Sequence, residues 1–585
     1  MSVKQIQQAS NHLYYGDNLE VLRESIPSES VDLVYLDPPF NSKATYNILF
    51  RTPSGAQSQA QIEAFEDTWH WNESAEQAFD DVLQSGNTSV AEMLSALRQY
   101  LKENDMMAYL TMMTVRLLEL RRILKKTGSL FLHCDPTASH YLKIILDGIF
   151  GVENFRSEII WRRTGSHHTK RKFGPIHDVI LFYTRSNDYY FKVVKRPYMR
   201  KHVEKRYTLD VGSGKMQFTS GGNVLTGEGI RKGESGMPWR NVDPTAKGRH
   251  WAIPGFLAEQ MDDEEFESFG VLAKLEALYQ VGLIEFTEGN AWPVPVRYLK
   301  PDDGQALQDI WAAQPYTEGT VFGSSDIVDA DVAWLGTTDP ERLGYPTQKP
   351  VGLLERIVEA ACPEGGSVLD PFCGCGTTIH AAQKLKRPWT GIDVTHLSIS
   401  LIEKRLKDAF PGISFDVHGT PKDIAGAAAL ALADKYQFQW WACSLVNAQP
   451  YQGKKKGADG GIDGIIYFKD EAKGHKKIIV SVKGGENVNV AMIRDLAHVV
   501  VREKADIGLF LTLSSPTKPM SVEAVKAGYY TSPATGHKFP KLQILSIDGL
   551  LSGTEKALYP DLSQGATTFK KAQVEESPVI QPKLF

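Results

Sequence analysis

The chain has 585 residues, 42% hydrophobic side chains and a formal net charge of −5 at pH 7. This length exceeds what one hydrophobic core supports, and the composition excludes a disordered or fibrous protein. The acidic balance excludes a uniformly basic nucleic-acid coat, so DNA binding would need local basic patches.

The cysteines and the apolar runs indicate the compartment. The five cysteines show neither a zinc-site spacing nor a disulfide framework, which is typical of a reducing cytoplasm. The N-terminal ten residues are polar, and no apolar run reaches membrane-spanning length. We therefore expect a cytoplasmic protein with no membrane segment.

Residues 1–184 alternate between strand and helix patterns, which predicts an α/β domain whose sheet is covered on both faces. We expect strands at 12–15, 31–36, 129–133 and 179–183, and helices at 19–23, 106–124 and 141–150. The helix over 106–124 is expected to end in a basic last turn, Lys125-Lys126, before Gly128. A polar stretch over about 48–105 is interpreted as a helical insertion.

An acid, two prolines and an aromatic residue follow the second expected strand, as Asp37, Pro38, Pro39 and Phe40. The two prolines fix φ and remove two N–H donors, so this corner presents carbonyl oxygens. A carboxylate and a carbonyl beside an aromatic ring suit a flat ring that bears an amino group, such as a nucleobase. Taken alone, the tetrapeptide could also be an ordinary exit from a strand into a turn.

Residues 185–340 are rich in Gly, Trp, Pro and charge and lack a sustained period, which predicts a separate recognition domain. Basic clusters lie just before this domain and at its start. Each could be solvated surface, but their position between the Asp37 corner and a later glycine-rich motif favours phosphate contact. The candidate DNA-binding residues are Arg162, Arg163, Lys170, Arg171, Lys172, Lys195 and Arg196.

The α/β pattern resumes over 341–410 and carries a glycine-rich loop. A short strand at 367–369 leads into Asp370-Pro-Phe-Cys-Gly-Cys-Gly and then a helix over 377–385, while a strand over 389–392 ends in Asp393. Glycines at a helix N-terminus let a bulky ligand approach the backbone, and an acid after the second strand typically holds ribose hydroxyls. This pattern favours a nucleoside cofactor. The absence of a Walker lysine and of the three-glycine spacing disfavours ATP and NAD.

The segment from Asp370 to Thr378, together with the Asp37 corner, resembles the amino-group DNA methyltransferases that use S-adenosylmethionine. Residues 345–350, Tyr-Pro-Thr-Gln-Lys-Pro, resemble a further cofactor-side motif of that family, and the order of the motifs resembles its permuted β group. The resemblance covers about residues 12–410. It implies a Rossmann-like sheet of seven mostly parallel strands, assembled from both ends of that span.

The resemblance also implies roles for individual residues. Asp37 and the Pro38 carbonyl would each accept one amino hydrogen, Phe40 would stack on the base, and the base would leave the duplex. An Asp before Pro-Pro is commoner in the adenine enzymes of this family, which favours adenine N6, with cytosine N4 as the alternative. The implied cofactor residues are Asp17, Lys349, Asp370, Phe372, Gly374, Gly376, Thr377 and Asp393.

The cysteines bear on a competing chemistry, the methylation of cytosine at C5, which needs a cysteine nucleophile that typically follows a proline. No cysteine in this chain follows a proline, which disfavours that reaction. Cys373 and Cys375 are interpreted instead as small residues in a crowded loop.

The remaining chain is interpreted as a helical connector (411–435), a last domain (436–553) and a polar, loosely held tail (554–585). In the last domain Asp463 precedes a strand over 465–468, and Lys483 ends a strand over 478–483. An acid and a lysine so placed are typical of Mg²⁺-dependent phosphodiester cleavage, with Asp463 as the metal ligand. The stretch resembles the Mrr-like branch of the PD-(D/E)XK nucleases, except that Ser481 stands where that family has Glu, Asp or Gln. An active nuclease and an inactive DNA-binding module both remain open, as does a plain turn and surface lysine.

We therefore expect a site-specific adenine methyltransferase that acts on double-stranded DNA in restriction-modification or anti-phage defence, with restriction or defence subunits as candidate partners. A solitary modification enzyme whose last domain only grips DNA is one alternative. A nuclease effector whose methylation marks self is another. The recognition sequence and the oligomeric state are not predicted.

Overall fold

The computed structural model describes residues 11–39, 45–51, 57–66, 70–166, 169, 171–210, 214–218, 225–261, 264–286, 292–345, 347–451, 460–471, 474–563 and 568–575. The chain forms two compact units. Unit 1 comprises residues 1–194, 308–313 and 331–577, and unit 2 comprises 195–307, 314–330 and 578–585. The finer domain boundaries expected from the sequence stay predictions.

Unit 1 is built on a nine-stranded sheet with the order β16-β6-β7-β5-β2-β17-β18-β1-β19. All neighbouring strands are parallel except that β7 runs antiparallel to both β5 and β6. The Rossmann-like seven-stranded sheet is confirmed, and the short strands β16 and β19 extend its two edges. The strands are β1 (His12–Tyr15), β2 (Val31–Leu36), β5 (Leu124–Cys134), β6 (Phe155–Arg162), β7 (His177–Thr184), β16 (Ile310–Trp311), β17 (Val368–Asp370), β18 (Trp389–Asp393) and β19 (Asp416–His418).

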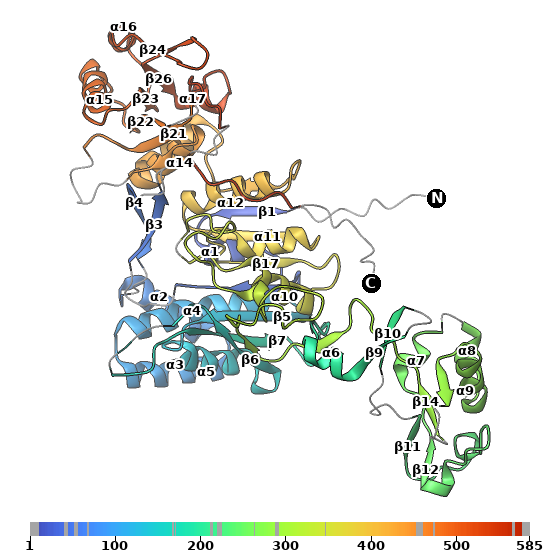
Figure 1. The fold of residues 1–585 in the computed structure, drawn as a ribbon. Helices are drawn as coiled ribbons and strands as arrows, with labels where there is room; N and C mark the ends of the chain where they lie inside the picture. The colour runs from blue at the N-terminus through green and yellow to red at the C-terminus, as the bar shows by residue number, and fades with distance from the viewer. Residues whose placement is uncertain are drawn as a thin grey trace, which may run out of the picture. The chain divides into compact units, whose positions relative to one another are not determined.

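The centre of this sheet joins the two ends of the sequence. β17 lies between β2 and β18, with Val368 opposite Leu33 on one side and Trp389 on the other. Because β2 and β17 are parallel neighbours, their carboxyl ends lie at the same edge of the sheet. Asp37 and the glycine-rich loop, more than three hundred residues apart in sequence, therefore start from adjacent points. Figure 1 shows β17, from the second half of the chain, between β1 and β5 from the first half.

Helices cover both faces of the sheet. Successive residues of a strand point to opposite faces, so Leu33 and Val34 of β2 belong to different hydrophobic clusters. Val34 packs with α1 (Asn18–Ser25), α4 (Asp105–Ile123) and α5 (Ser139–Phe150), beyond which lie α2 (Glu73–Gln84) and α3 (Thr88–Leu101). Leu33 packs with α10 (Val351–Ala361), α11 (Thr377–Lys384) and α12 (His396–Ala409).

Two local predictions in this half were wrong. Lys125 and Lys126 do not form a last helical turn, because α4 ends at Ile123 and β5 begins at Leu124. The insertion is not purely helical, since a hairpin of β3 (Thr45–Arg51) and β4 (Gln57–Glu66) precedes α2 and α3. Residues 59–64 of β4, Gln-Ala-Gln-Ile-Glu-Ala, alternate polar and apolar side chains, a strand pattern that the prediction of a helical insertion overlooked.

Unit 2 consists of short hairpins and helices. Its core contains Trp239, Trp251, Phe266, Leu275 and Leu278. The residues of such a small aromatic core do not recur at helix or strand spacing along the sequence. This explains why the sequence predicted no helices or strands here. The antiparallel pairs are β8 (Lys195–Pro197) with β15 (Gly304–Ala306), β9 (Tyr207–Asp210) with β10 (Lys215–Phe218), β11 (Thr226–Glu228) with β12 (Arg249–Trp251), and β13 (Ile284–Phe286) with β14 (Pro293–Pro295). The helices are α6 (Arg200–Arg206), α7 (Gly255–Ala258), α8 (Glu264–Ser268) and α9 (Val271–Gln280).

The C-terminal part of unit 1 contains a five-stranded sheet in the order β20-β21-β22-β23-β26. β20 (Gln449–Pro450), β21 (Gly464–Phe468) and β22 (Lys476–Lys483) are antiparallel, and β23 (Ile507–Thr512) and β26 (Leu542–Ser546) continue in parallel from β22. A small hairpin pairs β24 (Tyr529–Thr531) with β25 (Lys538–Pro540). Helices α13 (Ile424–Ala433), α14 (Lys435–Leu445) and α17 (Ile547–Leu551) pack with one face, and α15 (Val490–Arg502) and α16 (Lys518–Lys526) with the other.

The described part of the tail is held in place, contrary to the expectation of a loose segment. The Thr568 hydroxyl donates to the Tyr467 carbonyl at 2.7 Å, and Glu575 pairs with His380 of α11 at 2.8 Å. Among the described residues, no helix combines the length and apolarity needed to cross a membrane.

Candidate active site

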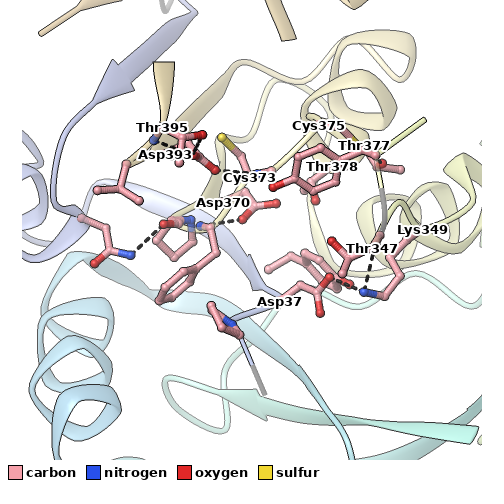
Figure 2. Close-up of a pocket in the computed structure, with 18 of the residues that line it drawn as sticks. Asp37, Thr347, Lys349, Asp370, Cys373, Cys375, Thr377, Thr378, Asp393 and Thr395 are labelled. Carbon is pink, nitrogen blue, oxygen red and sulfur yellow. Dashed lines mark hydrogen bonds and ion pairs between the residues drawn. The ribbon is translucent and has the colours of Figure 1, made fainter. Parts of the chain in front are cut away.

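A cavity of about 310 Å³ opens at the carboxyl edge of the large sheet. Loops from both ends of the sequence line it, so the Asp37 corner and the glycine-rich loop share one site (Figure 2). Of the residues singled out from the sequence, those lining it are Asp17, Asp37, Pro39, Lys349, Asp370, Phe372, Gly374, Thr377 and Asp393. Tyr35, Met112, Arg116 and Tyr345 also line it.

Asp37 lies directly beyond β2 and is paired with a lysine. The Lys349 ammonium group contacts Asp37 Oδ2 and lies 3.4 Å from the Thr347 carbonyl oxygen (Figure 2). Both side chains are mostly shielded, with 10% of Lys349 and 16% of Asp37 exposed. The family resemblance implies that Lys349 contributes to the cofactor-binding side of the site. In the structure its ammonium group pairs with the Asp37 carboxylate. Pro38 is buried, and Phe40 lies outside the described residues.

The glycine-rich loop is closely packed at two glycines. Gly374 and Gly376 have φ values of +51° and +75°, in the left-handed region. A Cβ on Gly374 would lie 3.3 Å from the Tyr345 ring, and one on Gly376 would lie 2.9 Å from Ile402 of α12. The loop backbone therefore packs tightly against its neighbours just before α11 begins at Thr377.

Two buried carboxyl groups flank this loop. Asp370 accepts a hydrogen bond from the Phe372 N–H at 3.0 Å, and burial raises its pKa to about 7, with repulsion from Asp37 and Asp393 adding to the shift. Asp393 Oδ2 accepts from the Gly374 N–H at 3.0 Å, and its Oδ1 accepts from the Thr395 N–H at 2.9 Å. Burial raises the pKa of Asp393 to about 6. Asp393 therefore fastens the end of β18 to the glycine loop.

Asp17 belongs to a polar cluster that the sequence only partly revealed. Its Oδ1 caps α1 by accepting the Leu19 N–H at 2.7 Å, and its carboxylate pairs with the buried Arg116 of α4 at 3.1 Å. Arg116 also donates to Asn18 Oδ1 at 2.6 Å, and the Asn18 amide donates to the Pro371 carbonyl at 2.8 Å. This chain of contacts ties α4 and α1 to the glycine loop. Asn18 and Arg116 were missed because neither belongs to a recognisable motif.

A buried hydrogen-bonded chain runs behind Asp37. The Tyr35 hydroxyl contacts His133 Nδ1 at 2.8 Å, and His133 Nε2 contacts Asp178 Oδ2 at 3.2 Å. These residues come from β2, β5 and β7, so the chain crosses three adjacent strands. The pKa of Asp178 is lowered, because its hydrogen bond to His133 and nearby positive charges outweigh its burial. Each residue looks like part of an ordinary apolar strand in the sequence, so no local pattern marks this chain.

The loop cysteines are not activated. Cys373 and Cys375 are buried, and desolvation raises the pKa of both thiols, that of Cys373 by the larger amount. A thiol with a raised pKa carries little thiolate at neutral pH and is a poor nucleophile. This agrees with the interpretation of both cysteines as small packing residues.

The candidate DNA-binding cations differ in whether their side chains contact other groups of the protein. Arg162 donates to the Ala313 carbonyl at 3.3 Å, Arg163 pairs with Asp178 at 3.2 Å and Arg196 pairs with Asp329 at 3.5 Å. Arg171, Lys172 and Lys195 are exposed, and Lys170 lies outside the described residues. Phosphate contact by this set stays a prediction.

A second polar cluster forms in the C-terminal domain. Val482 N–H donates to Asp463 Oδ2 at 2.6 Å, Ser481 Oγ lies 3.4 Å from the same oxygen, and Lys483 Nζ lies 3.7 Å from it. The Gln439 side-chain amide of α14 donates to Asp463 Oδ1. The described residues therefore bring together one carboxylate, one lysine and one amide. The contact of Gln439 with Asp463 was not predicted from the sequence.

Two protein-family models and several curated proteins match this chain. A protein-family model described as DNA methylase matches residues 31–404, and one described as restriction endonuclease matches residues 430–530. The chain is 28% identical over 401 residues to the Type II methyltransferase M.EcaI of Enterobacter cloacae, which covers 68% of this chain and 69% of that protein. It is 26% identical over 378 residues to the Type III restriction-modification enzyme StyLTI Mod subunit of Salmonella typhimurium, which covers 63% of this chain and 49% of the relative.

Among solved structures, a Thermus thermophilus protein, TTHA0409, complexed with S-adenosyl-L-methionine matches 70% of this chain and 99% of its own. The identity is 15% and the TM-score is 0.30.

Proposed function

This chain belongs to the DNA methylase family, and on that premise we propose that it transfers a methyl group from S-adenosylmethionine to the exocyclic N6 of adenine in DNA. One observation carries the proposal. The Asp37 carboxylate and the Asp370–Thr377 loop line the same cavity, although they come from opposite ends of the matched region. A methyl donor and an extruded base could therefore meet in one place.

The cavity residues fit the methyl donor. The volume of about 310 Å³ lies at the lower end of the range of about 300 to 1,000 Å³ usual for small-molecule sites. Gly374 allows close approach to the loop backbone, Phe372 offers an aromatic face, and Asp393 and Asp17 offer acceptors for hydroxyl and amino groups. When bound, S-adenosylmethionine supplies an electrophilic methyl group on a positively charged sulfur, and the buried Asp370 carboxyl lies in the same cavity wall.

The Asp37 corner has the chemistry to activate an amine. The nitrogen lone pair of adenine N6 is delocalised into the ring, which makes the amine a poor nucleophile. If the Asp37 carboxylate and the Pro38 carbonyl each accept one amino hydrogen, the nitrogen becomes more tetrahedral and its lone pair more available. Lys349 contacts one oxygen of Asp37, but a carboxylate has about four acceptor sites, so this ion pair leaves capacity for substrate. Fixed positioning and fixed dipoles then supply most of the acceleration.

The choice of adenine rests on the Asp-Pro-Pro corner, which resembles the adenine enzymes of the family. Cytosine N4 presents the same kind of amine and is the alternative. Either base must leave the duplex, because a stacked and paired amine cannot enter a cavity within the protein. The exposed cations Arg171, Lys172 and Lys195 would contact the phosphate backbone, and unit 2 would read the sequence.

Labelled-methyl transfer tests the proposal directly. We expect the purified protein to move the methyl group of S-adenosylmethionine onto duplex DNA and to yield N6-methyladenine after digestion to nucleosides. Asp37→Ala should lower the rate at least about a hundredfold, because it removes one of the two acceptors that polarise the amine. Binding of S-adenosylmethionine, measured by calorimetry, should persist in that variant.

The exposed Asp188 provides a matched control, since Asp188→Ala removes a carboxylate far in sequence from either loop. Full activity of Asp37→Ala would refute the assigned corner. Formation of N4-methylcytosine instead would support the assigned site and show that the target base is cytosine.

We also propose that the C-terminal domain hydrolyses DNA weakly, at the cluster of Asp463 and Lys483. The match to a restriction endonuclease model supports this, as does the convergence of Asp463, Ser481, Lys483 and Gln439. Asp463 is the residue that would hold Mg²⁺. Because the described part of this cluster contains a single carboxylate, metal binding should be weak.

Cleavage of supercoiled plasmid in Mg²⁺ tests this second activity. Asp463→Ala and Lys483→Ala should each abolish cleavage, while Gln439→Glu, which adds a second carboxylate beside Asp463, should increase it. Cleavage that persists in both alanine variants would place the activity elsewhere. A complete absence of cleavage in Gln439→Glu, with DNA binding retained, would favour a domain that only grips DNA.

By analogy with relatives that include a Type III Mod subunit, we infer a role in restriction-modification with a separate restriction subunit as a candidate partner. This inference can be checked by co-expression with neighbouring genes and purification of the complex.

A further inference from the structure

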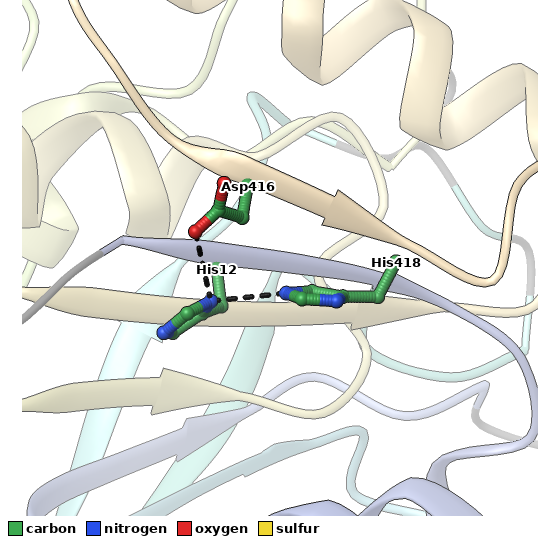
Figure 3. Close-up of side chains that lie close together, drawn as sticks. All are labelled: His12, Asp416 and His418. Carbon is green, nitrogen blue, oxygen red and sulfur yellow. Dashed lines mark hydrogen bonds and ion pairs between the residues drawn. The ribbon is translucent and has the colours of Figure 1, made fainter. Parts of the chain in front are cut away.

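Two histidines and an aspartate meet at the edge of the large sheet, on the last pair of strands. β1 and β19 are parallel, with His12 opposite Asp416 and Tyr14 opposite His418. Side chains two residues apart along a strand point to the same face, so His12 and Tyr14 share a face, as do Asp416 and His418. The register therefore brings these side chains together (Figure 3).

The potential ligand atoms are close to the separations that a metal site requires. His12 Nδ1 lies 3.0 Å from His418 Nε2 and 3.9 Å from Asp416 Oδ2, and one ligand atom from each residue lies within 4.8 Å of the other two. Zn²⁺ binds imidazole nitrogen and carboxylate oxygen at about 2.0 to 2.2 Å, so ligand atoms in a tetrahedral site lie about 3.3 Å apart. The two separations from His12, 3.0 and 3.9 Å, lie on either side of that value.

The surroundings hold these side chains in place. The His418 ring stacks on Tyr14, with ring centroids 4.5 Å apart and an interplanar angle of 18°. Just beyond His418, Gly419 has a φ of +77°, and a Cβ there would lie 2.1 Å from the Tyr15 carbonyl oxygen. The end of β19 is therefore packed directly on the end of β1. Because its ring is already stacked on Tyr14, His418 loses little conformational entropy on binding a metal.

The charge and exposure of the cluster also suit a cation. The Asp416 carboxylate supplies one negative charge beside the two imidazole rings. The Asp416 side chain is 67% exposed and that of His12 is 30% exposed, so a metal could enter from solvent and keep water in a remaining position.

We propose that His12, Asp416 and His418 form a binding site for Zn²⁺ or a similar first-row divalent cation. Two imidazoles and one carboxylate form a ligand set suited to Zn²⁺ rather than to Mg²⁺ or Ca²⁺, which prefer all-oxygen sites. Within the described part of the chain, this is the group of three or more His, Cys, Asp or Glu side chains close enough to hold a metal. The bound ion would cross-link β19 to β1, and β1 leads directly into Gly16 and Asp17 of the cavity wall.

Zn²⁺ titration of the full chain against a chromophoric chelator tests the site. After removal of metals, wild-type protein should bind one Zn²⁺, and His418→Ala and Asp416→Asn should each weaken that binding at least tenfold. Both variants should be made in an Asp463→Ala background, which removes the proposed Mg²⁺ ligand of the C-terminal domain. His498→Ala, which removes an exposed histidine on α15, serves as the matched control and should bind as wild type does.

A second readout guards against misfolded variants. Co²⁺ bound to the wild-type chain should give visible d–d absorption bands, and equimolar Zn²⁺ should abolish them. The metal-free melting temperature of Asp416→Asn should match that of wild type, whereas only wild type should gain stability on addition of Zn²⁺. Undiminished Zn²⁺ affinity in His418→Ala, or absence of both the titrated site and the Co²⁺ bands in wild type, would overturn the proposal and leave a plain hydrogen bond between two histidines.

Discussion

The Asp370 carboxyl group is buried at the end of β17, and its pKa is raised from 3.8 to about 7. The folded state therefore holds this proton more tightly than the unfolded chain does. Between about pH 4 and about pH 7 the unfolded chain has lost the proton and the folded state has not, so the free energy of unfolding falls as pH rises. At 1.36 kcal/mol per pKa unit, the full cost above pH 7 is at most about 4 kcal/mol.

Asp370→Asn should remove this pH dependence, because the amide keeps the shape and does not ionise. We expect the stability of the variant relative to wild type to increase from about pH 5 to about pH 8, measured by chemical denaturation. Asp188→Asn, at an exposed position, controls for general pH effects. A stability difference that stays constant across this range would show that Asp370 is ionised throughout.

At the residue scale, the sequence predicted which side chains would line the cavity better than it predicted their contacts. Asp37, Asp370 and Asp393 stood at strand ends with glycines and prolines around them, which is a strong local signal. The contact between Lys349 and Asp37 spans more than three hundred residues and depends on how β2 and β17 pair. No local pattern encodes such a pairing.

At the scale of elements, the glycine loop between β17 and α11 gives a sharp test. Gly376 and Gly412 both have φ in the left-handed region, at +75° and +85°, but only Gly376 has a neighbour that an added Cβ would meet, Ile402 at 2.9 Å. Gly412 has nothing within 4 Å of that position. An alanine at either site would therefore have a strained backbone, but only the one at position 376 would also meet a neighbouring side chain.

Gly412→Ala should cost about 1 to 2 kcal/mol through the left-handed backbone alone. Gly376→Ala should cost more, and should also weaken S-adenosylmethionine binding because the loop must shift. Denaturant unfolding and calorimetric titration measure the two effects. Equal destabilisation by both substitutions, with cofactor affinity retained, would mean that close packing of this loop is unimportant.

The predicted strands and helices of unit 1 agree with the structure where the apolar period is long, as in α4 and β5, although their shared boundary was misplaced. The β3–β4 hairpin and the hairpins of unit 2 were missed. The paired strands of unit 2 are only three or four residues long, too short to show an apolar period in the sequence.

At the scale of the whole molecule, the order of motifs along the chain was the decisive signal. It implied that strands from both ends would interleave, and β17 and β18 indeed lie between β2 and β1. The sequence did not predict where the last described residues, 568–575, pack. Glu575 accepts a hydrogen bond from His380, whose pKa is lowered to about 4 by burial, so a neutral imidazole meets the carboxylate. Such a contact between α11 and the chain's last described segment has no local signature.

The central claim is that one cavity holds a methyl donor at the Asp370 loop and an extruded base amine at Asp37. Long-read modification mapping of DNA from cells that express the protein tests it most directly, because it reports base, position and sequence context together. We predict N6-methyladenine within one recurring sequence in cells with the wild-type protein, and its loss in cells with Asp37→Ala at equal protein level. Unmodified DNA in wild-type cells, or the same methylation pattern with Asp37→Ala, would contradict the account.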